Sequence, residues 1–173
     1  MKRIIVNRND EIIGAKSNAE IVSSDIYRVS QVWVVADGKV LIQQRKFDKR
    51  NDPGKWGPSV AGRVEEGETY LTNAQKELGE EVGIFDTVEP MHEESKFHDG
   101  QHKYFVKKFI VRGEWTLDDF TPQESEVEAL KLVEINDLLS DIDAWPTKYL
   151  DNFRENVLGL MDYLNNDEAK NDQ

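Results

Sequence analysis

The 173-residue sequence contains no cysteine and only three histidines. Without thiols, the chain cannot form a disulfide scaffold, a thiolate zinc site, an iron–sulfur cluster or a cysteine nucleophile. The histidines lack the helical spacing of a two-histidine zinc site, and surface roles are expected for all three. Any chemistry in this chain must therefore come from other side chains.

Long apolar runs and a positive net charge are also missing. No stretch approaches the roughly 18 apolar residues that a membrane span requires, and the start of the chain turns polar too early for a signal peptide. The balance of 34 acidic and 22 basic residues gives a formal net charge of -12. Because an acidic surface repels phosphate backbones, we expect neither a nucleic-acid polymer nor a membrane as partner. The expected location is cytoplasmic.

The order of apolar patterns predicts one α/β domain over residues 1–165, followed by a polar tail at 166–173. Apolar residues on both sides of an Asn/Asp-rich turn predict an N-terminal hairpin over residues 3–13. Further strands are expected at 26–35, from 40 onwards, at 59–62 and near 88–97, 103–112 and 127–133. Helices are expected at 69–82, at 135–141 and from Pro146 to about Leu164. Strands between helices of this kind indicate an α/β/α sandwich around a mixed sheet.

Residues 69–82 carry the clearest helical pattern. Apolar residues recur three or four positions apart on one face, namely Leu71, Ala74, Leu78 and Val82. Thr69 can cap the first turn, and Gly83 stands where the end of a helix favours a positive φ. We therefore expect this helix to end at residue 82.

Three carboxylates share another sector of the same helix. Glu77, Glu80 and Glu81 stand at positions i, i+3 and i+4, so their charges repel one another by a few tenths of a kcal/mol per pair. A hard divalent cation such as Mg²⁺ would offset that repulsion, because it prefers oxygen ligands. A solvated acidic face is the ordinary alternative for an acidic chain.

The segment from Gly62 to Ile84 resembles the Nudix box. In that family, a glycine is followed at fixed spacing by a glutamate, an Arg-Glu pair, an aliphatic residue, a Glu-Glu pair, a glycine and an aliphatic residue. The matching positions are Gly62, Glu68, Glu77, Leu78, Glu80, Glu81, Gly83 and Ile84. One position departs from the pattern, since Lys76 stands where the family has arginine.

The resemblance implies a Nudix fold and a metal-dependent phosphoanhydride hydrolase that uses Mg²⁺ or Mn²⁺. Glu77, Glu80 and Glu81 would be the catalytic metal ligands, and the carbonyl oxygen of Ala61 would be a further ligand. The structural positions of the motif would be Gly62, Glu68, Lys76 and Gly83. Because lysine cannot reproduce a bidentate guanidinium contact, we expect weakened support of the loop before the helix, with the metal site retained.

Over residues 2–155 the chain is similar to the isopentenyl diphosphate isomerase-like branch of this family. That branch holds the substrate diphosphate with an arginine and a lysine four residues later, which correspond to Arg45 and Lys49. The isomerase cysteine and histidine are replaced by Ala61 and Arg63. Glu77 stands where the isomerase lacks a glutamate, so the resemblance implies hydrolase chemistry on an isomerase-like scaffold.

Hydrolases of this family often use an acid beyond the box. Glu124, Glu126 and Glu128 precede an expected strand, and alternation along an extended segment would place all three on one side. Glu126 is our first candidate for the additional acid. The alternative is that all three side chains are exposed without a catalytic role.

The sequence therefore predicts a hydrolase that cleaves a small-molecule diphosphate, with nucleoside di- or triphosphates and their derivatives as the substrate class that the family implies. Two alternatives stay open: an isopentenyl diphosphate isomerase-type enzyme, and a module that senses a nucleotide without turnover. The sequence also leaves a homodimer open.

Overall fold

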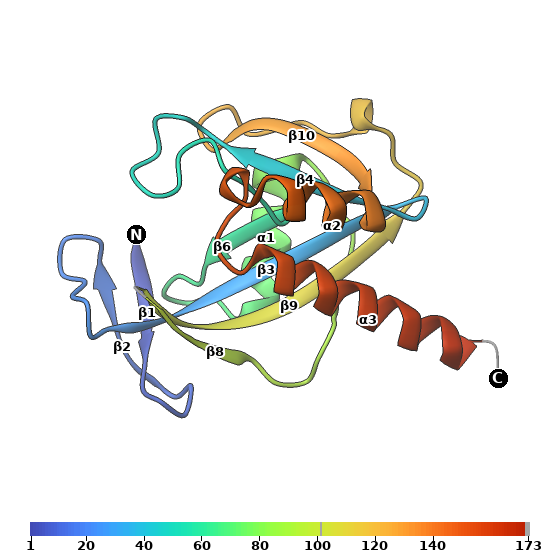
Figure 1. Cartoon of the computed structure of the whole chain (residues 1–173). Coiled ribbons are helices and arrows are strands. Elements are labelled where there is room, and N and C mark those ends of the chain that lie inside the picture. Colours follow the sequence, from blue (N-terminus) through green and yellow to red (C-terminus); the bar gives the residue numbers. More distant parts are fainter. Residues whose placement is uncertain (101, 172–173) are drawn as a thin grey trace.

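The computed structural model describes residues 1–100 and 102–171. It contains one mixed sheet between helices, with α1 (Tyr70–Val82) on one face and α2 (Ile135–Ala144) and α3 (Phe153–Asn171) on the other (Figure 1). The predicted α/β/α sandwich with an N-terminal hairpin is confirmed. In chain order the strands are β1 (Lys2–Val6), β2 (Ile12–Ser17), β3 (Ile26–Ala36), β4 (Lys39–Arg45), β5 (Trp56–Gly57), β6 (Val60–Arg63), β7 (Glu89–Pro90), β8 (Lys96–Asp99), β9 (Lys103–Gly113) and β10 (Val127–Glu134).

The loop at residues 64–69, which we call the Nudix-box loop, joins β6 to α1 and lies next to the central strand β3. Strand β3 pairs with β9 in parallel along its whole length and with β4 only at the hairpin tip. Beyond that tip, β5 pairs with β4, and β6 pairs with β3. Strands β3 and β4 therefore diverge beyond the tip, and the Nudix-box loop begins between them, at the end of β6.

Each face of the sheet has its own hydrophobic core because side chains alternate along β3. Val32 and Val34 pack with the apolar face of α1, while Trp33 and Val35 pack with α2 and α3. The ring of Trp33 stacks on Phe153 at the start of α3, with the ring centroids 5.9 Å apart. The sheet thus carries α1 and its carboxylates on one side and α3 on the other.

The buried face of α1 differs from the predicted one at its first turn. Ala74, Leu78 and Val82 are fully buried, but Leu71 is 42% exposed. The buried position in this turn belongs to Asn73, whose amide reaches Glu68 and the carbonyl oxygen of Arg63. A polar side chain can occupy this site because its donors have acceptors there.

The last helix begins and ends later than predicted. Pro146–Lys148 forms a separate 3-10 turn, and α3 begins only at Phe153, after Asn152 adopts a positive φ of 62°. We predicted a polar tail at 166–173, but α3 continues to Asn171, and residues 172–173 lie outside the described residues. One contact that supports the extension joins Arg112 Nη2 on β9 to Asp167 Oδ2 at 2.8 Å.

No helix in the described ranges is both long enough and apolar enough to cross a membrane.

Candidate functional site

The backbone at both ends of α1 fixes the direction in which its carboxylates point. Thr69 caps the N-terminus, accepting a hydrogen bond from the backbone N–H of Thr72, whose own side chain accepts from the N–H of Thr69. Gly83 ends the helix with φ 76°, a left-handed conformation that glycine adopts without strain. These caps hold the glutamates of the helix in one register against β6.

Glu81 is the most buried carboxylate of the motif, at 7% exposed. Burial raises its pKa to about 8, and the charge of Glu77 adds to the shift. The amide of Gln43 on β4 donates to Glu81 Oε2 at 2.8 Å, and a backbone hydrogen bond from Ala61 also favours the charged form. Glu81 therefore lies between α1, β4 and β6, at the centre of the predicted site.

Glu77 adds negative charge next to Glu81, and Glu80 adds negative charge next to Glu77. Burial raises the pKa of Glu77 and the charge of Glu80 raises it further, while Lys76 and Asn73 act in the opposite direction. Glu80 is exposed to solvent. The sequence alone does not distinguish these three carboxylates. In the structure, Glu81 is buried, Glu77 is half-buried and Glu80 is exposed.

This donor set fits a hard divalent cation. Within residues 1–100 and 102–171, no three carboxylates or imidazoles are already gathered as a complete cation cage. Burial is the main cause that raises the pKa values of Glu77 and Glu81, and a neighbouring carboxylate adds to each shift. Oxygen ligands in this condition suit Mg²⁺ or Mn²⁺, and the metal roles of these residues and of the Ala61 carbonyl stay predictions.

Lys76 connects the loop before α1 to the helix through three carboxylates. Its Nζ lies 2.8 Å from Glu68, 3.3 Å from Glu65 and 3.5 Å from Glu77. Burial lowers the pKa of Lys76, but these glutamates more than compensate, so the net shift is upward. The single ammonium group of Lys76 thus contacts Glu65 and Glu68 in the loop and Glu77 on the helix.

Glu68 and Asn73 complete this connection. Burial raises the pKa of Glu68, but Lys76, the backbone N–H of Glu65 and Asn73 together hold it below its usual value. Asn73 donates to Glu68 Oε2 at 2.9 Å and to Glu77 Oε1 at 3.3 Å. Sequence reasoning missed Asn73, although its position one helical turn before Glu77 was a usable signal.

The basic loop after β4 meets the candidate additional acid. Lys49 Nζ lies 2.6 Å from Glu126 Oε1, and the charge of Glu126 in turn raises the pKa of Glu81. Arg45 pairs with Val127 across the strands and donates from Nε to the carbonyl oxygen of Asn51 at 3.2 Å. The structure therefore brings Lys49, Glu126 and Glu81 into one electrostatic neighbourhood.

The predicted alternation of Glu124, Glu126 and Glu128 is wrong. Residues 124–126 form a turn, and β10 begins only at Val127 with an irregular register against β4. Glu128 instead pairs with Lys46, at 3.2 Å. The turn arises because the backbone N–H groups of Glu126 and Val127 both bond the carbonyl oxygen of Gln123.

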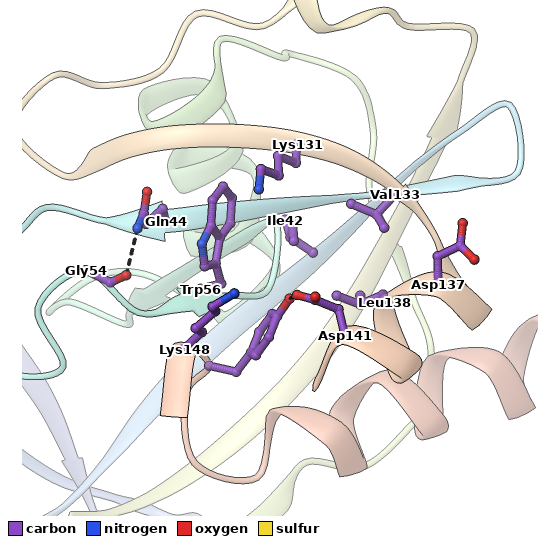
Figure 2. Close-up of a pocket in the computed structure, with 11 residues that line it drawn as sticks. Ile42, Gln44, Gly54, Trp56, Lys131, Val133, Asp137, Leu138, Asp141 and Lys148 are labelled. Atoms are coloured by element: carbon purple, nitrogen blue, oxygen red, sulfur yellow. Dashed lines mark hydrogen bonds between the residues drawn. The ribbon is translucent and has the colours of Figure 1, made fainter. Parts of the chain in front are cut away.

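A cavity of about 590 Å³ lies on the α2 side of β4 and β10 (Figure 2). Figure 2 shows Lys131 beside the ring of Trp56, with its Nζ 4.5 Å from the ring centroid. Gln44 lines the same cavity and points away from α1, whereas its neighbour Gln43 contacts Glu81. The sheet therefore separates this cavity from the carboxylates of α1.

Comparison with curated proteins identifies Nudix relatives. An uncharacterized Nudix hydrolase of Listeria monocytogenes is 29% identical over 132 residues, which cover 75% of this chain and 77% of that protein. Nudix hydrolase 3 of Arabidopsis thaliana is 33% identical over 121 residues, or 63% of this chain and 16% of that protein. An isopentenyl-diphosphate Delta-isomerase of Serratia proteamaculans is 33% identical over 83 residues, or 47% of this chain and 46% of that protein. The chain thus spans less than half the length of two of these three relatives.

Solved structures share the fold at low identity. The DR0079 protein of Deinococcus radiodurans superimposes with a TM-score of 0.75 at 20% identity, covering 91% of this chain and 97% of that one. A C. elegans Ap4A hydrolase has a TM-score of 0.58 at 20% identity, covering 81% and 98%. The family model of the NUDIX domain matches residues 27–153. The chain belongs to the NUDIX domain family, and its relatives are consistent with the isopentenyl diphosphate isomerase-like branch.

Proposed function

We propose that this protein is a metal-dependent hydrolase that cleaves a phosphoanhydride bond in a nucleoside di- or triphosphate or a related nucleoside diphosphate derivative. The observation that carries the proposal is the position of Glu81, which is buried beside Ala61 and next to the charge of Glu77. Glu81 has no ammonium or guanidinium partner among the described residues, and a bound cation would stabilise a buried carboxylate of this kind. The nucleoside class comes from the family, in which a protein of the same fold is named an Ap4A hydrolase.

In this proposal, the carboxylates of Glu77, Glu80 and Glu81 and the carbonyl oxygen of Ala61 hold Mg²⁺ or Mn²⁺. The bound cation would neutralise the diphosphate and activate water for attack on phosphorus. Gln43 and Ala61 hydrogen-bond Glu81, so this proposed ligand would be positioned before substrate arrives. The products would be a monophosphate together with phosphate or a second phosphorylated fragment.

The residues around this centre have supporting roles. Arg45 and Lys49 would contact the substrate diphosphate, and the ion pair between Lys49 and Glu126 would hold the basic loop beside the cation. Glu126 is the candidate additional acid, because its charge acts directly on Glu81. Lys76 would fix the loop through Glu65 and Glu68, and it also contacts Glu77, one of the proposed metal ligands.

An isopentenyl diphosphate isomerase-type activity is the second candidate, since curated isomerases are among the relatives. The isomerase cysteine and histidine are absent at Ala61 and Arg63, and the chain has no cysteine elsewhere. Interconversion of the two isomers, followed by NMR, tests this candidate directly. We expect no interconversion.

The hydrolase proposal is tested by release of phosphate and nucleotide products from a panel of diphosphate compounds with Mg²⁺, Mn²⁺ or chelator. The wild type is compared with Glu81→Gln and with Glu66→Gln, an exposed glutamate in the same box that the motif does not require. We expect Glu81→Gln to lower turnover by about three orders of magnitude and Glu66→Gln to leave it unchanged.

A thermal melt provides a second readout that does not depend on turnover. Mg²⁺ should raise the melting temperature of the wild type and of Glu66→Gln, but not that of Glu81→Gln. Equal rates in wild type and Glu81→Gln, or an equal shift with Mg²⁺, would contradict the metal site. Tight metal-dependent binding without any product would favour the nucleotide sensor over the enzyme.

A further inference from the structure

One half of the α3 face of the sheet is not covered by a helix. Figure 1 shows α3 starting over the middle of β3, while the first half of β3 runs out beside β6 towards β1. Alternation places Gln31 on this face, because Trp33, two residues later, packs under α3. Ala61 and Arg63 on β6 are exposed here, so the face is open next to the Nudix-box loop.

Gln31 and Lys108, which we call the donor row, lie side by side on this face of the sheet. Gln31 is directly opposite Ala61 on β6 and in register with Lys108 on β9. Lys108 points to the same face, because its Nζ reaches Asn156 Oδ1 on α3 at 2.5 Å. The donor row therefore extends from the proposed metal ligand Ala61 towards the start of α3.

The donor row has more hydrogen-bond donors than it has acceptors within reach. Gln31 is only 6% exposed, yet its Nε2 has no hydrogen-bond partner among the described residues. Lys108 has Asn156 as a side-chain acceptor and no carboxylate within ion-pair distance in the same part of the chain. Burial, assisted by the charge of Lys96, lowers the pKa of Lys108 to about 8. Leaving a buried donor unpaired is unfavourable, so a ligand with acceptor atoms would be favoured here.

Arg63 adds positive charge at the end of the donor row that lies next to Ala61. It stands two residues after Ala61 on the same face of β6, with its guanidinium 5.6 Å from the ring centroid of Tyr27. No carboxylate lies within ion-pair distance of Arg63 in the described ranges. In a chain with a net charge of -12, this concentration of unpaired cations and donors is a local exception.

We propose that the donor row is the subsite for the part of the substrate beyond the cleaved diphosphate, and that it selects a group with oxygen acceptors over an apolar chain. This inference rests on the proposed function and names its specificity. A nucleobase carbonyl and a second phosphate both offer the required oxygens. A prenyl group offers none. It would leave the Gln31 amide without an acceptor and Lys108 with Asn156 alone, and a site built to hydrogen-bond its ligand disfavours such a group strongly.

Equilibrium binding of three uncleavable ligands tests this selection. The ligands are the methylene-bridged analogues of uridine diphosphate, 5-phosphoribosyl 1-diphosphate and isopentenyl diphosphate, measured by titration calorimetry with Mg²⁺. They share the diphosphate and differ in the remaining group, which carries base carbonyls, a second phosphate or only a C5 chain. We expect the wild type to bind at least one of the first two about tenfold or more tightly than the third.

Two variants assign the preference to the donor row. Lys108→Met and Gln31→Leu should each reduce the preference over the isopentenyl analogue about tenfold, with unchanged far-UV circular dichroism. Lys107→Met is the matched control, because Lys107 is the neighbouring lysine and donates instead to the carbonyl oxygen of Glu93. It should leave all three dissociation constants unchanged. Whichever of the first two analogues loses affinity identifies the acceptor group.

The subsite is overturned if the three analogues bind equally, if none binds, or if both donor-row variants keep the full wild-type preference. Hydrolysis of the three parent diphosphates is measured separately and reports on the proposed function. A retained preference without turnover would overturn the hydrolase and leave the subsite standing. Turnover with equal dissociation constants would overturn the subsite alone.

Discussion

Glycine at position 62 is required by the carboxylate that packs against it. A Cβ atom built on Gly62 would overlap the side chain of Glu77, whose carboxylate is one of the proposed metal ligands. The overlapping atoms are the flexible end of a side chain, so the backbone can stay in place while Glu77 moves. The motif glycine thus leaves room for Glu77, a proposed ligand, and matters less for the backbone fold.

We therefore expect Gly62→Ala to separate activity from stability. Turnover should fall about tenfold or more because Glu77 is displaced, while the free energy of unfolding should change by about 1 kcal/mol or less. Gly14→Ala is a suitable control, because a Cβ there meets no atom within 4 Å. Steady-state kinetics and urea unfolding measure the two effects. A stable variant with wild-type turnover would contradict the proposed role of Glu77.

The charge pattern of α1 becomes meaningful only together with the loop before it. The acidic side chains of the helix are balanced on one side by Lys76, which also reaches Glu65 and Glu68 in the loop. Lysine replaces the family arginine here, and its single ammonium distributes contacts among three carboxylates. At the scale of the element, Lys76 joins loop and helix into one unit.

Lys76→Ala should destabilise this unit because it leaves three partly buried carboxylates without a counter-charge. Since the lysine side chain is 30% exposed, solvent screening moderates the effect, and we expect a loss of about 1–2 kcal/mol in the free energy of unfolding. Lys76→Arg should retain wild-type stability within about 0.5 kcal/mol. Urea unfolding measures both, and equal stability of the alanine variant would argue against a structural role for the contacts.

Stability of the whole molecule should depend on pH through Lys108. Burial and the charge of Lys96 lower its pKa to about 8, and the charge of Glu155 opposes the shift only in part. Between about pH 8 and the unfolded-state value of about 10.5, the unfolded chain binds more protons at this lysine than the native chain. The contribution of Lys108 to the free energy of unfolding therefore rises with pH across this window and is least favourable below pH 8.

Lys108→Met removes this dependence. We expect the variant to be more stable than the wild type at pH 7, by about 1–3 kcal/mol, and the difference to shrink steadily as the pH rises from 8 to 10.5. Comparing the two proteins by urea unfolding at each pH cancels the other titrating groups. A difference that is constant with pH would mean that Lys108 keeps an ordinary pKa in the native state.

The sequence predicted much of this molecule because its signals are local. The α1 helix follows from apolar spacing, a capping threonine and a terminal glycine, and the strands follow from β-branched runs next to turn residues. The last helix was misplaced because Pro146 can begin a short 3-10 turn as well as a long helix. Contacts with distant residues, such as that of Asp167 with Arg112, then extended α3 through a segment of polar residues.

The sequence by itself determined the family, the fold class and the set of carboxylates, because motif spacing and residue periodicity are properties of the chain. Only the tertiary structure decided which carboxylate is buried, since burial of Glu81 depends on Gln43 and Ala61 from other strands. It alone brought Glu126 to the basic loop and set Gln31 beside Lys108, far apart in sequence. The pairing of strands and the packing of helices place such residues together, and neither is encoded in local spacing.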